Sequence, residues 1–296
     1  MSKNKTHKVA GLGEVLWDVF PDKKKLGGAP ANFAAHTQQL GAQSYLLSAV
    51  GKDALGQTAI VKLKRLGIDT SGVQFNRHSS TGRVIVTLDP MGNPDYKIEE
   101  NSAWDQIQFD TIQVKIAQSL DAICFGTLSQ RNAVSQNSVL KILKATTANC
   151  LRVFDVNFRQ DFYHPKMLEQ SLDLANAVKM NEDEFSVIAA LFSLPKNHKK
   201  ALHLLMRKFD LKFGIITLGE KGAVMANQDH FCSYSPKSKI KIKSTVGAGD
   251  AFTAATVMGW LEQNPLEQII QKASDLATFV CSHLEAVPAK QKTKTQ

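Results

Sequence analysis

Hydrophobic and polar positions along the chain follow two alternating patterns. Short apolar runs predict strands, and stretches with apolar residues every three or four positions predict helices. A strand opens within 7–19, a helix spans 29–41, a strand covers 43–51, and a helix follows Asp53, a favoured N-cap residue, up to residue 67. Further predicted strands, each followed by a helical stretch, are 121–127, 151–157, 176–181 and 212–219.

This order of elements indicates an α/β fold with a parallel sheet and helices on both of its faces. Such sheets bind ligands beyond the carboxyl ends of their strands, so candidate site residues should follow strands. Residues 73–100 break the rhythm and predict antiparallel strands around a turn at 89–94. Together with 17–26, the segment 73–101 is expected to form a lid over a site.

Composition and charge narrow the class of protein. The chain has 296 residues, 43% hydrophobic and 21% charged, as in ordinary soluble proteins. Its net charge of +9 comes from dispersed basic clusters that lack the interleaved aromatic residues of a single-strand binder. We expect a basic solvated surface, and a nucleic-acid partner is not expected, although it stays as a third class of function.

Targeting signals and cysteine usage point to one compartment. The first residues lack an apolar stretch of signal-peptide length, and polar residues interrupt the uncharged run 26–51, so no membrane span is expected. The four cysteines show no paired spacing. We expect a cytoplasmic protein with reduced core cysteines, rather than disulfides or a cysteine metal site.

The stretch "STVGAGDAF" (244–252) follows a strand-like run of alternating Lys and Ile and enters a long apolar helix. The first amides of a helix lack intrahelical partners, and the helix dipole favours negative charge there. Gly247 and Gly249 would let an anion approach these amides closely. Asp250 beside them suits a base that faces a hydroxyl attacking a phosphoryl group; the alternative is a carboxylate that merely caps the helix beside a tight turn.

Two common nucleotide motifs are excluded. The chain contains no G-x-x-x-x-G-K-[ST], the phosphate-binding loop of P-loop enzymes. "GLGEVL" begins as G-x-G, but Leu16 stands where the third glycine of the dinucleotide fingerprint is required.

Six segments occur in order and together carry a resemblance: "GEVLWD" (13–18), "GGAPANFAAH" (27–36), "DVNFRQDF" (155–162), "NEDE" (181–184), "TLGEKGA" (217–223) and "TVGAGDAF" (245–252). The set resembles the ribokinase/fructokinase family of carbohydrate kinases, the PfkB type, from Gly11 to Pro288. The resemblance implies a ribokinase-like three-layer α/β/α fold with a mostly parallel central sheet and a small antiparallel β lid. It also implies one domain over 1–296.

The resemblance assigns the reaction to the glycine-rich helix start. Asp250 matches the family's catalytic base, which takes the proton of the attacking sugar hydroxyl. Gly247, Ala248 and Gly249 match the amides of its anion hole, which hold the migrating phosphoryl group. Direct in-line transfer from ATP, without a phosphoenzyme, is therefore expected.

Sugar-binding positions are also implied by the resemblance. Asp18, Gly28 and Asn32 match residues that contact sugar hydroxyls. A carboxylate and an amide suit a sugar because each can accept or donate more than once. The alternatives are that Asp18 is a surface turn residue and that Asn32 caps a helix after Pro30.

A third group matches the family's nucleotide and metal environment. Glu184 is expected to act on Mg²⁺ through water, because magnesium on a nucleotide keeps several waters; otherwise it is an exposed helical carboxylate. The matching nucleotide-binding positions are Asn181, Thr217, Gly219 and Gly222.

Two departures from the family pattern stand out. Ser244 occupies a position where members commonly have Asp, which puts metal or nucleotide handling in doubt. Glu285 precedes Ala286 where members often have a Gly-Ala pair of a potassium-binding loop, so potassium activation is doubtful. Weaker candidates for the site, all near strand ends or in the lid, are Arg83, Gln130, Arg131 and Arg159.

The expected function is an ATP- and Mg²⁺-dependent sugar kinase, with fructose as the first choice because "GEVLWD", "GGAPANFA" and "FGTLSQR" look most like fructokinases. Alternatives are ribose, another hexose, a keto-deoxy sugar acid, or a non-catalytic relative that binds sugar or nucleotide. A homodimer through the lid is expected from the family.

Overall fold

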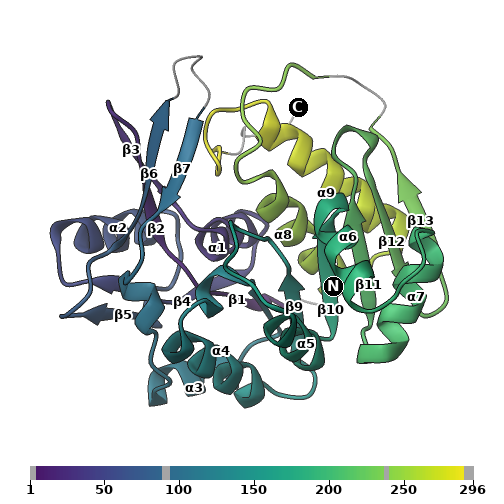
Figure 1. Cartoon of the computed structure of the whole chain (residues 1–296), viewed down its shortest axis with the longest axis horizontal. Helices are drawn as coiled ribbons and strands as arrows, with labels where there is room; N and C mark the ends of the chain where they lie inside the picture. Colours follow the sequence, from purple (N-terminus) through teal and green to yellow (C-terminus); the bar gives the residue numbers. More distant parts are fainter. Residues whose placement is uncertain (1–4, 89–93, 237–239, 290–296) are drawn as a thin grey trace.

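The central sheet has nine strands, arranged in the order β13-β12-β11-β10-β9-β8-β1-β4-β5 (Figure 1). In this computed structural model the described residues are 5–88, 94–236 and 240–289. The strands from β11 to β5 run parallel, and β12 and β13 add an antiparallel edge. Their bounds are β1 Lys8–Leu12, β4 Gln43–Gly51, β5 Val73–Asn76, β8 Ala122–Phe125, β9 Leu151–Asp155, β10 Ala177–Asn181, β11 Phe213–Thr217, β12 Ala223–Asn227 and β13 Phe231–Tyr234.

Helices cover both faces of this sheet, so the expected three layers are confirmed. Successive residues of a strand pack into different cores: Val9 of β1 lies with residues of α8 and α9, and Ala10 lies with residues of α4 to α7. One layer contains α1 Ala29–Gln39, α2 Ala54–Arg65, α8 Ala248–Leu261 and α9 Leu266–Cys281, and the other α3 Thr111–Ala117, α4 Ala133–Ala145, α5 Pro165–Leu174, α6 Glu182–Leu191 and α7 His198–Phe209. Short turns of 3₁₀ helix are η1 Ala103–Gln106, η2 Leu128–Gln130 and η3 Gly219–Lys221.

The pattern-based helix ends are confirmed at α1 and α2. Pro30 stands in the first turn of α1, where its missing N–H costs nothing, and Gly41 follows the helix with φ +101°. The Asp53 carboxylate caps α2 by accepting from the amide of Gly56 at 2.7 Å.

A smaller sheet of four strands forms the lid, in the order β3-β2-β6-β7. Its strands are β2 Leu16–Val19, β3 Lys24–Gly27, β6 Gly82–Leu88 and β7 Pro94–Ile98. The expectation of an antiparallel lid is wrong at one pair, because β2 and β6 run parallel while the two outer pairs are antiparallel. Figure 1 shows the lid strands rising away from the central sheet beside α1 and α2.

Three boundaries differ from the sequence prediction. The stretch 7–19 is two strands in different sheets, because the chain turns at Gly13, whose φ of +142° suits glycine. Val73–Asn76, expected in the lid, instead pairs with β4 at the edge of the central sheet. The expected turn at 89–94 falls, up to residue 93, outside the described residues.

The run of alternating Lys and Ile before α8 was expected to be strand-like, which is wrong for its described part, 240–243. The amide of Lys243 there donates to the carbonyl of Cys281 at 2.9 Å. The segment therefore lies against the end of α9 and belongs to no strand, although its alternating pattern fits one.

Contacts on two sides hold the lid over the carboxyl ends of the strands. The ammonium of Lys25 on β3 donates to the carbonyl of Leu284, beyond α9, at 2.8 Å. The side-chain amide of Gln160, in the loop after β9, donates to the carbonyl of Tyr96 on β7 at 3.1 Å. Two hydrogen bonds thus join the lid to the segment after α9 and to the loop after β9.

The cysteine prediction agrees with the structure. Cys124, Cys150 and Cys232 are buried and Cys281 is half-buried, and all four are free thiols. Among the described residues, none of the helices combines the length and apolar character that a bilayer crossing requires.

A buried ion pair lies at the junction between lid and body. The Arg131 guanidinium binds both carboxylate oxygens of Asp105, at 2.8 and 2.7 Å, and both side chains are nearly fully buried. The guanidinium also lies 4.1 Å from the ring centre of Trp104. Removing one member of such a pair leaves the other charge buried without its partner.

We predict that Asp105→Ala lowers the free energy of unfolding by about 3 kcal/mol or more, because Arg131 stays buried and unpaired. Urea denaturation measures the change. Lys23→Ala is the matched control: it breaks an exposed pair with Asp22 at 3.4 Å, and its effect should stay within about 0.5 kcal/mol. Equal effects of the two substitutions would contradict the prediction.

Candidate active site

The start of α8 and the start of α1 meet at the carboxyl ends of the central strands. The side-chain amide of Asn32 on α1 donates to Asp250 Oδ2 at 2.8 Å, joining residues 218 positions apart. Asn32 is buried and Asp250 is half-buried. The structure therefore brings together the two residues that sequence analysis assigned to base and sugar binding.

The mouth of α8 has the bare backbone that its sequence suggested. Gly247 has φ +83°, and a Cβ there would lie 2.8 Å from Cα and Cβ of Ala286, so no side chain fits. The amide of Ala248 donates to the carbonyl of Thr245 at 3.2 Å. The amides of Gly249 and Asp250 find no acceptor within the described part of the chain, so they remain available to an anion.

The other two sugar-site candidates lie at the start of α1 and on the lid. Gly28 is the N-cap of α1 with φ +109°, and Asp18 lies on the lid strand β2. A Cβ on Gly27 would lie 3.0 Å from Asp18 Oδ2, so this glycine leaves room for the carboxylate. Asp18 thus belongs to the lid, and Gly28 directly follows the lid strand β3.

Sequence analysis did not single out Glu14, a buried carboxyl directly after the turn at Gly13. It lines a narrow pocket together with Asp155, Asn157 and Asp250. The available signal was its place in "GEVLWD", one residue past a glycine that ends a strand. That signal marks a loop position but not burial, which depends on α1 packing over it.

Burial dominates the electrostatics of three carboxyl groups, Glu14 and Asp250 in this pocket and Asp18 on the lid. It raises the pKa of Glu14 to about 7, and it raises the pKa values of Asp18 and Asp250 to about 6. Arg159 opposes each shift, and the hydrogen bond from Asn32 opposes that of Asp250. Carboxyl groups that titrate near neutrality are suited to moving a proton.

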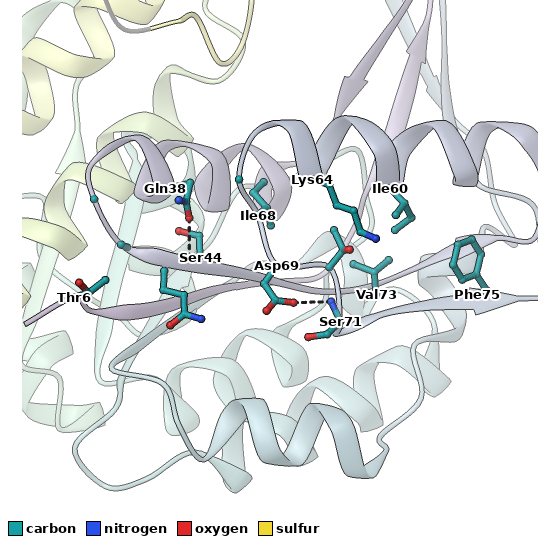
Figure 2. Close-up of a pocket in the computed structure, with 15 residues that line it drawn as sticks. Thr6, Gln38, Ser44, Ile60, Lys64, Ile68, Asp69, Ser71, Val73 and Phe75 are labelled. Carbon is teal, nitrogen blue, oxygen red and sulfur yellow. Dashed lines mark hydrogen bonds between the residues drawn. The ribbon is translucent and has the colours of Figure 1, made fainter. Parts of the chain in front are cut away.

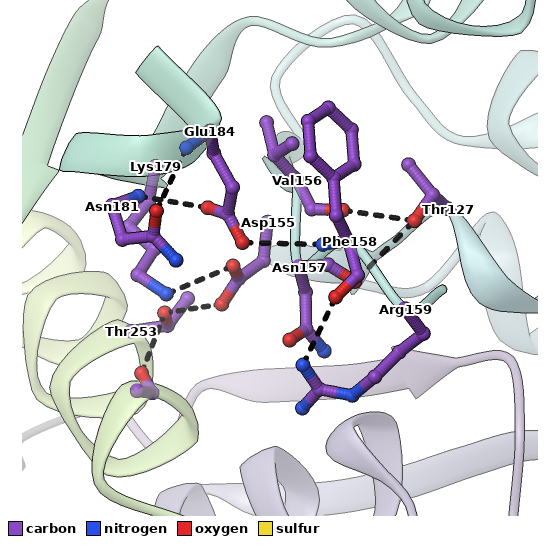
Figure 3. Close-up of polar contacts among 11 residues, drawn as sticks. Thr127, Asp155, Val156, Asn157, Phe158, Arg159, Lys179, Asn181, Glu184 and Thr253 are labelled. Carbon is purple, nitrogen blue, oxygen red and sulfur yellow. Dashed lines mark hydrogen bonds and ion pairs between the residues drawn. The ribbon is translucent and has the colours of Figure 1, made fainter. Parts of the chain in front are cut away.

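A polar network lies just inside the mouth of α8 (Figure 3). Lys179 on β10 donates to Asp155 Oδ1 on β9 at 3.0 Å, and both side chains are buried. The hydroxyl of Thr253 on α8 donates to Asp155 Oδ2 at 2.7 Å. Sequence analysis missed Lys179; its signal was one cation within an otherwise apolar strand, which by itself gives no partner.

Asn181 and Glu184 form a reciprocal cap at the start of α6. The Asn181 side chain accepts from the amide of Glu184 at 2.8 Å, and Glu184 Oε2 accepts from the amide of Asn181 at 2.7 Å. Glu184 Oε1 accepts from the amide of Phe158 at 3.1 Å, so the carboxylate ties two strand ends together (Figure 3). Glu184 is buried, and so it is not the exposed helical carboxylate of the alternative interpretation.

The other nucleotide candidates lie on the neighbouring strand end. Thr217 is the register partner of Asn181 across β10 and β11. Gly219 and Gly222 have φ of +58° and +97°, and the amide of Leu218 donates to the carbonyl of Gly222 at 2.8 Å. Only glycine fits at Gly222, where an added Cβ would clash with the backbone of Tyr234, whereas the space around Gly219 is open.

The weaker candidates separate clearly. Arg83 forms an ion pair with Glu99 at 2.7 Å in the lid. Arg131 forms the buried ion pair with Asp105. Gln130 is buried and donates to the carbonyl of Gly126 at 2.8 Å. Arg159 is exposed and acts electrostatically on the pocket carboxyls, and its guanidinium donates to the carbonyl of Phe158 at 3.1 Å.

A comparison with models of protein families places nearly the whole chain in one of them. The model of the pfkB family carbohydrate kinases matches residues 6–293. The chain belongs to this family. The assignment drawn from six motifs is therefore confirmed, as is the ribokinase-like fold.

Relatives of this PfkB kinase cover nearly all of it. A protein of Pyrococcus horikoshii assigned as sugar kinase PH1459 is 29% identical over 88% of this chain and 84% of its own length. The structure of PH1459 with ATP has a TM-score of 0.79, at 27% identity and 94% coverage of each chain. Fructokinase of Salmonella typhimurium is 27% identical over 95% of this chain and 96% of its own. A protein of E. coli assigned as ribokinase II, solved with ATP and Mg²⁺, shares the fold at TM-score 0.82, 20% identity, and coverage of 96% and 95%.

The side chains of this PfkB kinase that could bind a metal ion are those of His, Cys, Asp and Glu. No cluster of three or more His, Cys, Asp or Glu side chains that could hold an ion occurs among the described residues. Magnesium bound to a triphosphate keeps several waters and needs few protein ligands. The residues present therefore fit an ion that arrives with a nucleotide better than a permanent protein-bound one.

A separate hollow of about 850 Å³ lies along α1 and α2 (Figure 2). Thr6, Gln43 and Ser44 place part of it at the amino ends of β1 and β4, away from the strand ends that face Asp250. Its polar groups are largely satisfied locally: Gln38 accepts from the amide of Ser44 at 3.1 Å and Asp69 from that of Ser71 at 2.8 Å. The candidate active site is the narrow pocket beside Asp250.

We predict that Glu14→Gln stabilises the protein more at pH 8 than at pH 5. The folded pKa of about 7 lies above the ordinary 4.5, so the unfolded chain releases a proton that the folded state keeps, and wild-type stability falls as the pH rises between these values. The gain of the variant at pH 8 should approach about 3 kcal/mol. Urea denaturation at the two pH values measures it, and a difference independent of pH would contradict the burial argument.

Proposed function

We propose that the protein transfers the γ-phosphoryl group of Mg-ATP to a hydroxyl of a free sugar, with fructose as the first choice. The observation that carries this proposal is the helix mouth of α8. A half-buried carboxylate, Asp250, stands beside two amides that have no acceptor among the described residues, and it receives a hydrogen bond from Asn32. A base and an anion cradle at one point are what phosphoryl transfer to an alcohol requires.

In the proposed mechanism Asp250 takes the proton of the attacking hydroxyl, and Asn32 orients its carboxylate. The amides of Gly249 and Asp250, with the Gly247–Ala248 turn that presents them, receive the charge that develops on the migrating phosphoryl group. Asp18 and Gly28 hold further sugar hydroxyls. The lid, tied down through Lys25 and Gln160, excludes water that would otherwise accept the phosphoryl group.

For ATP and Mg²⁺ the support comes from relatives and from the strand ends. PH1459 is solved with ATP and the E. coli relative with ATP and Mg²⁺. Asn181, Thr217, Gly219 and Gly222 lie on adjacent strand ends, and we assign the nucleotide to them. Glu184 would act on the ion through water, since both of its oxygens already accept backbone amides; the ion would neutralise phosphate charge.

The charge of the pocket favours a neutral sugar. Glu14, Asp18 and Asp250 contribute three carboxyl groups, and Arg159 is the cation that acts on all three. Carboxylates suit hydroxyl donors and repel a phosphate or a carboxylate on the substrate. Among neutral sugars fructose comes first because of the similarity to fructokinase; ribose or another hexose are the alternatives.

One observation favours a second candidate, a keto-deoxy sugar acid. Arg159 is exposed near the pocket, and its guanidinium donates to a backbone carbonyl of its own loop. A guanidinium in this position can bind a substrate carboxylate in a bidentate manner. Arg159→Met should then raise KM for the sugar acid far more than KM for a neutral sugar.

A substrate panel tests the proposal directly. Coupled ADP release with Mg-ATP should be fastest with fructose, slower with ribose and other hexoses, and lower with keto-deoxygluconate. A preference for the sugar acid would shift the assignment to the second candidate. Release with none of these sugars would contradict a sugar kinase and favour a non-catalytic binding protein.

We predict that Asp250→Asn lowers kcat by about 10²- to 10⁴-fold while leaving KM for ATP nearly unchanged, because the amide keeps the contact with Asn32 but accepts no proton. In the wild type kcat should fall as the pH drops through about 6, where Asp250 becomes protonated. Steady-state kinetics between pH 5 and 9 measure both. Near-normal turnover of the variant would remove Asp250 from its role.

The homodimer through the lid stays a prediction. Tyr96 on β7 is 44% exposed, so the lid presents at least one large aromatic side chain to solvent. Sedimentation velocity of the wild type and of Tyr96→Glu would test it: a monomeric wild type contradicts the dimer, and dissociation of the variant supports it.

A further inference from the structure

Lys179 is a buried cation to which the proposed mechanism assigns no role. It lies on β10 between Val178 and Met180, which pack into the core on the opposite face of the sheet. Its register partner on β9 is Asp155. Both side chains therefore point to the face that α8 covers.

The contacts fix the ammonium at the start of α8 (Figure 3). Its Nζ donates to Asp155 Oδ1 at 3.0 Å, and the side chains are 8% and 9% exposed. A Cβ placed on Gly249 would lie only 3.2 Å from Nζ, so the ammonium rests against bare backbone in the first turn of the helix. Thr253, one turn further along α8, holds the other oxygen of Asp155 at 2.7 Å.

Packing alone does not account for this ion pair. Neighbouring positions on the same face are apolar, among them Val153, Ala177 and Ile215. A buried ion pair contributes little net stability compared with apolar residues of similar volume. What the pair adds at this place is charge next to Asp250.

The charges around Asp250 come from several elements. The titratable groups that face it are Glu14 after β1, Cys124 on β8, Asp155 on β9, Arg159 after β9 and Lys179 on β10. The carboxylate of Asp155 disfavours ionised Asp250, whereas the cations Lys179 and Arg159 favour it. Glu184 faces Lys179 from the start of α6.

We propose that Lys179 is a positioning residue of phosphoryl transfer: its ammonium, fixed by Asp155 against the first turn of α8, offsets the surrounding negative charge and holds Asp250 in its ionised form. The inference rests on the proposed function, in which Asp250 is the base. Lys179 acts through Asp250 and α8, because it is not among the residues that line the pocket.

Two substitutions at the ion pair test this role. Lys179→Gln deletes the positive charge but keeps a donor for Asp155, and Asp155→Asn deletes the negative charge but keeps an acceptor. The acid limb of the kcat profile should move up by about 1 pH unit in Lys179→Gln and down by about 1 unit in Asp155→Asn. Lys212→Gln, which removes an exposed lysine at the amino end of β11, is the matched control and should leave the limb in place.

Opposite displacements are the result that a structural role does not produce. If Lys179 served folding alone, both substitutions would lower stability and the limb would stay at the wild-type pH. The proposal would be overturned if the acid limb stayed at the wild-type pH in the two variants, or if it moved in the same direction in both. Where one single variant fails to fold, the double variant replaces it: adding the second change must move the limb of the surviving single variant back toward the wild type.

A readout without turnover separates this inference from the proposed function. The titration of the Asp250 carboxyl can be followed by ¹³C NMR in protein labelled at aspartate, with Asp250→Asn to assign the signal. A wild type without kinase activity would contradict the proposed function alone, and the NMR midpoints would still decide on Lys179. An active wild type whose midpoint is the same in the two variants would reject Lys179 alone.

Discussion

The burial of several carboxyl groups in one place is the constraint on which this site depends. Glu14, Asp155 and Asp250 line one pocket where strand ends and two helix starts converge, and Asp18 is a further carboxyl on the lid strand β2. Carboxylates in such a space resist ionisation unless donors or cations compensate them. Asn32 and the exposed Arg159 provide part of that compensation, and the ammonium of Lys179 provides more from inside the sheet.

The fold explains why these groups can be kept so close. Parallel strands end at one edge of the sheet, so Asp155 at the end of β9 and Lys179 on β10 become neighbours without a connecting loop. The starts of α1 and α8 lie over the same edge, and the first amides of a helix favour negative charge there. Folding therefore concentrates carboxylates and the groups that stabilise them in one space.

The lid adds Asp18 to this environment, so the candidate site residues are divided between the lid and the body. Asp18 stands on a lid strand, whereas Asp250 stands on a helix of the body, so the position of the lid determines whether the two can serve one substrate. Contacts of Lys25 with the segment after α9 and of Gln160 with β7 keep the lid near the body.

Local patterns in the sequence were enough for the fold class, the ends of α1 and α2, and the glycine-rich mouth of α8. Each depends on neighbouring residues: the period of apolar positions, the Asp53 cap, and the freedom of Gly247 to adopt a positive φ. The motifs also assigned Asp250 and Asn32 to one site, as base and sugar-binding residue, and a 2.8 Å hydrogen bond joins the two side chains in the structure. The run of Lys and Ile before α8 shows the limit, because an alternating pattern forms a strand only where a sheet edge is there to accept it. The pairing of β5 with the central sheet, the parallel β2–β6 pair, the burial of Glu14 and the contact of Lys179 with Asp155 were decided by tertiary structure alone, since each requires segments far apart in the chain to come into register.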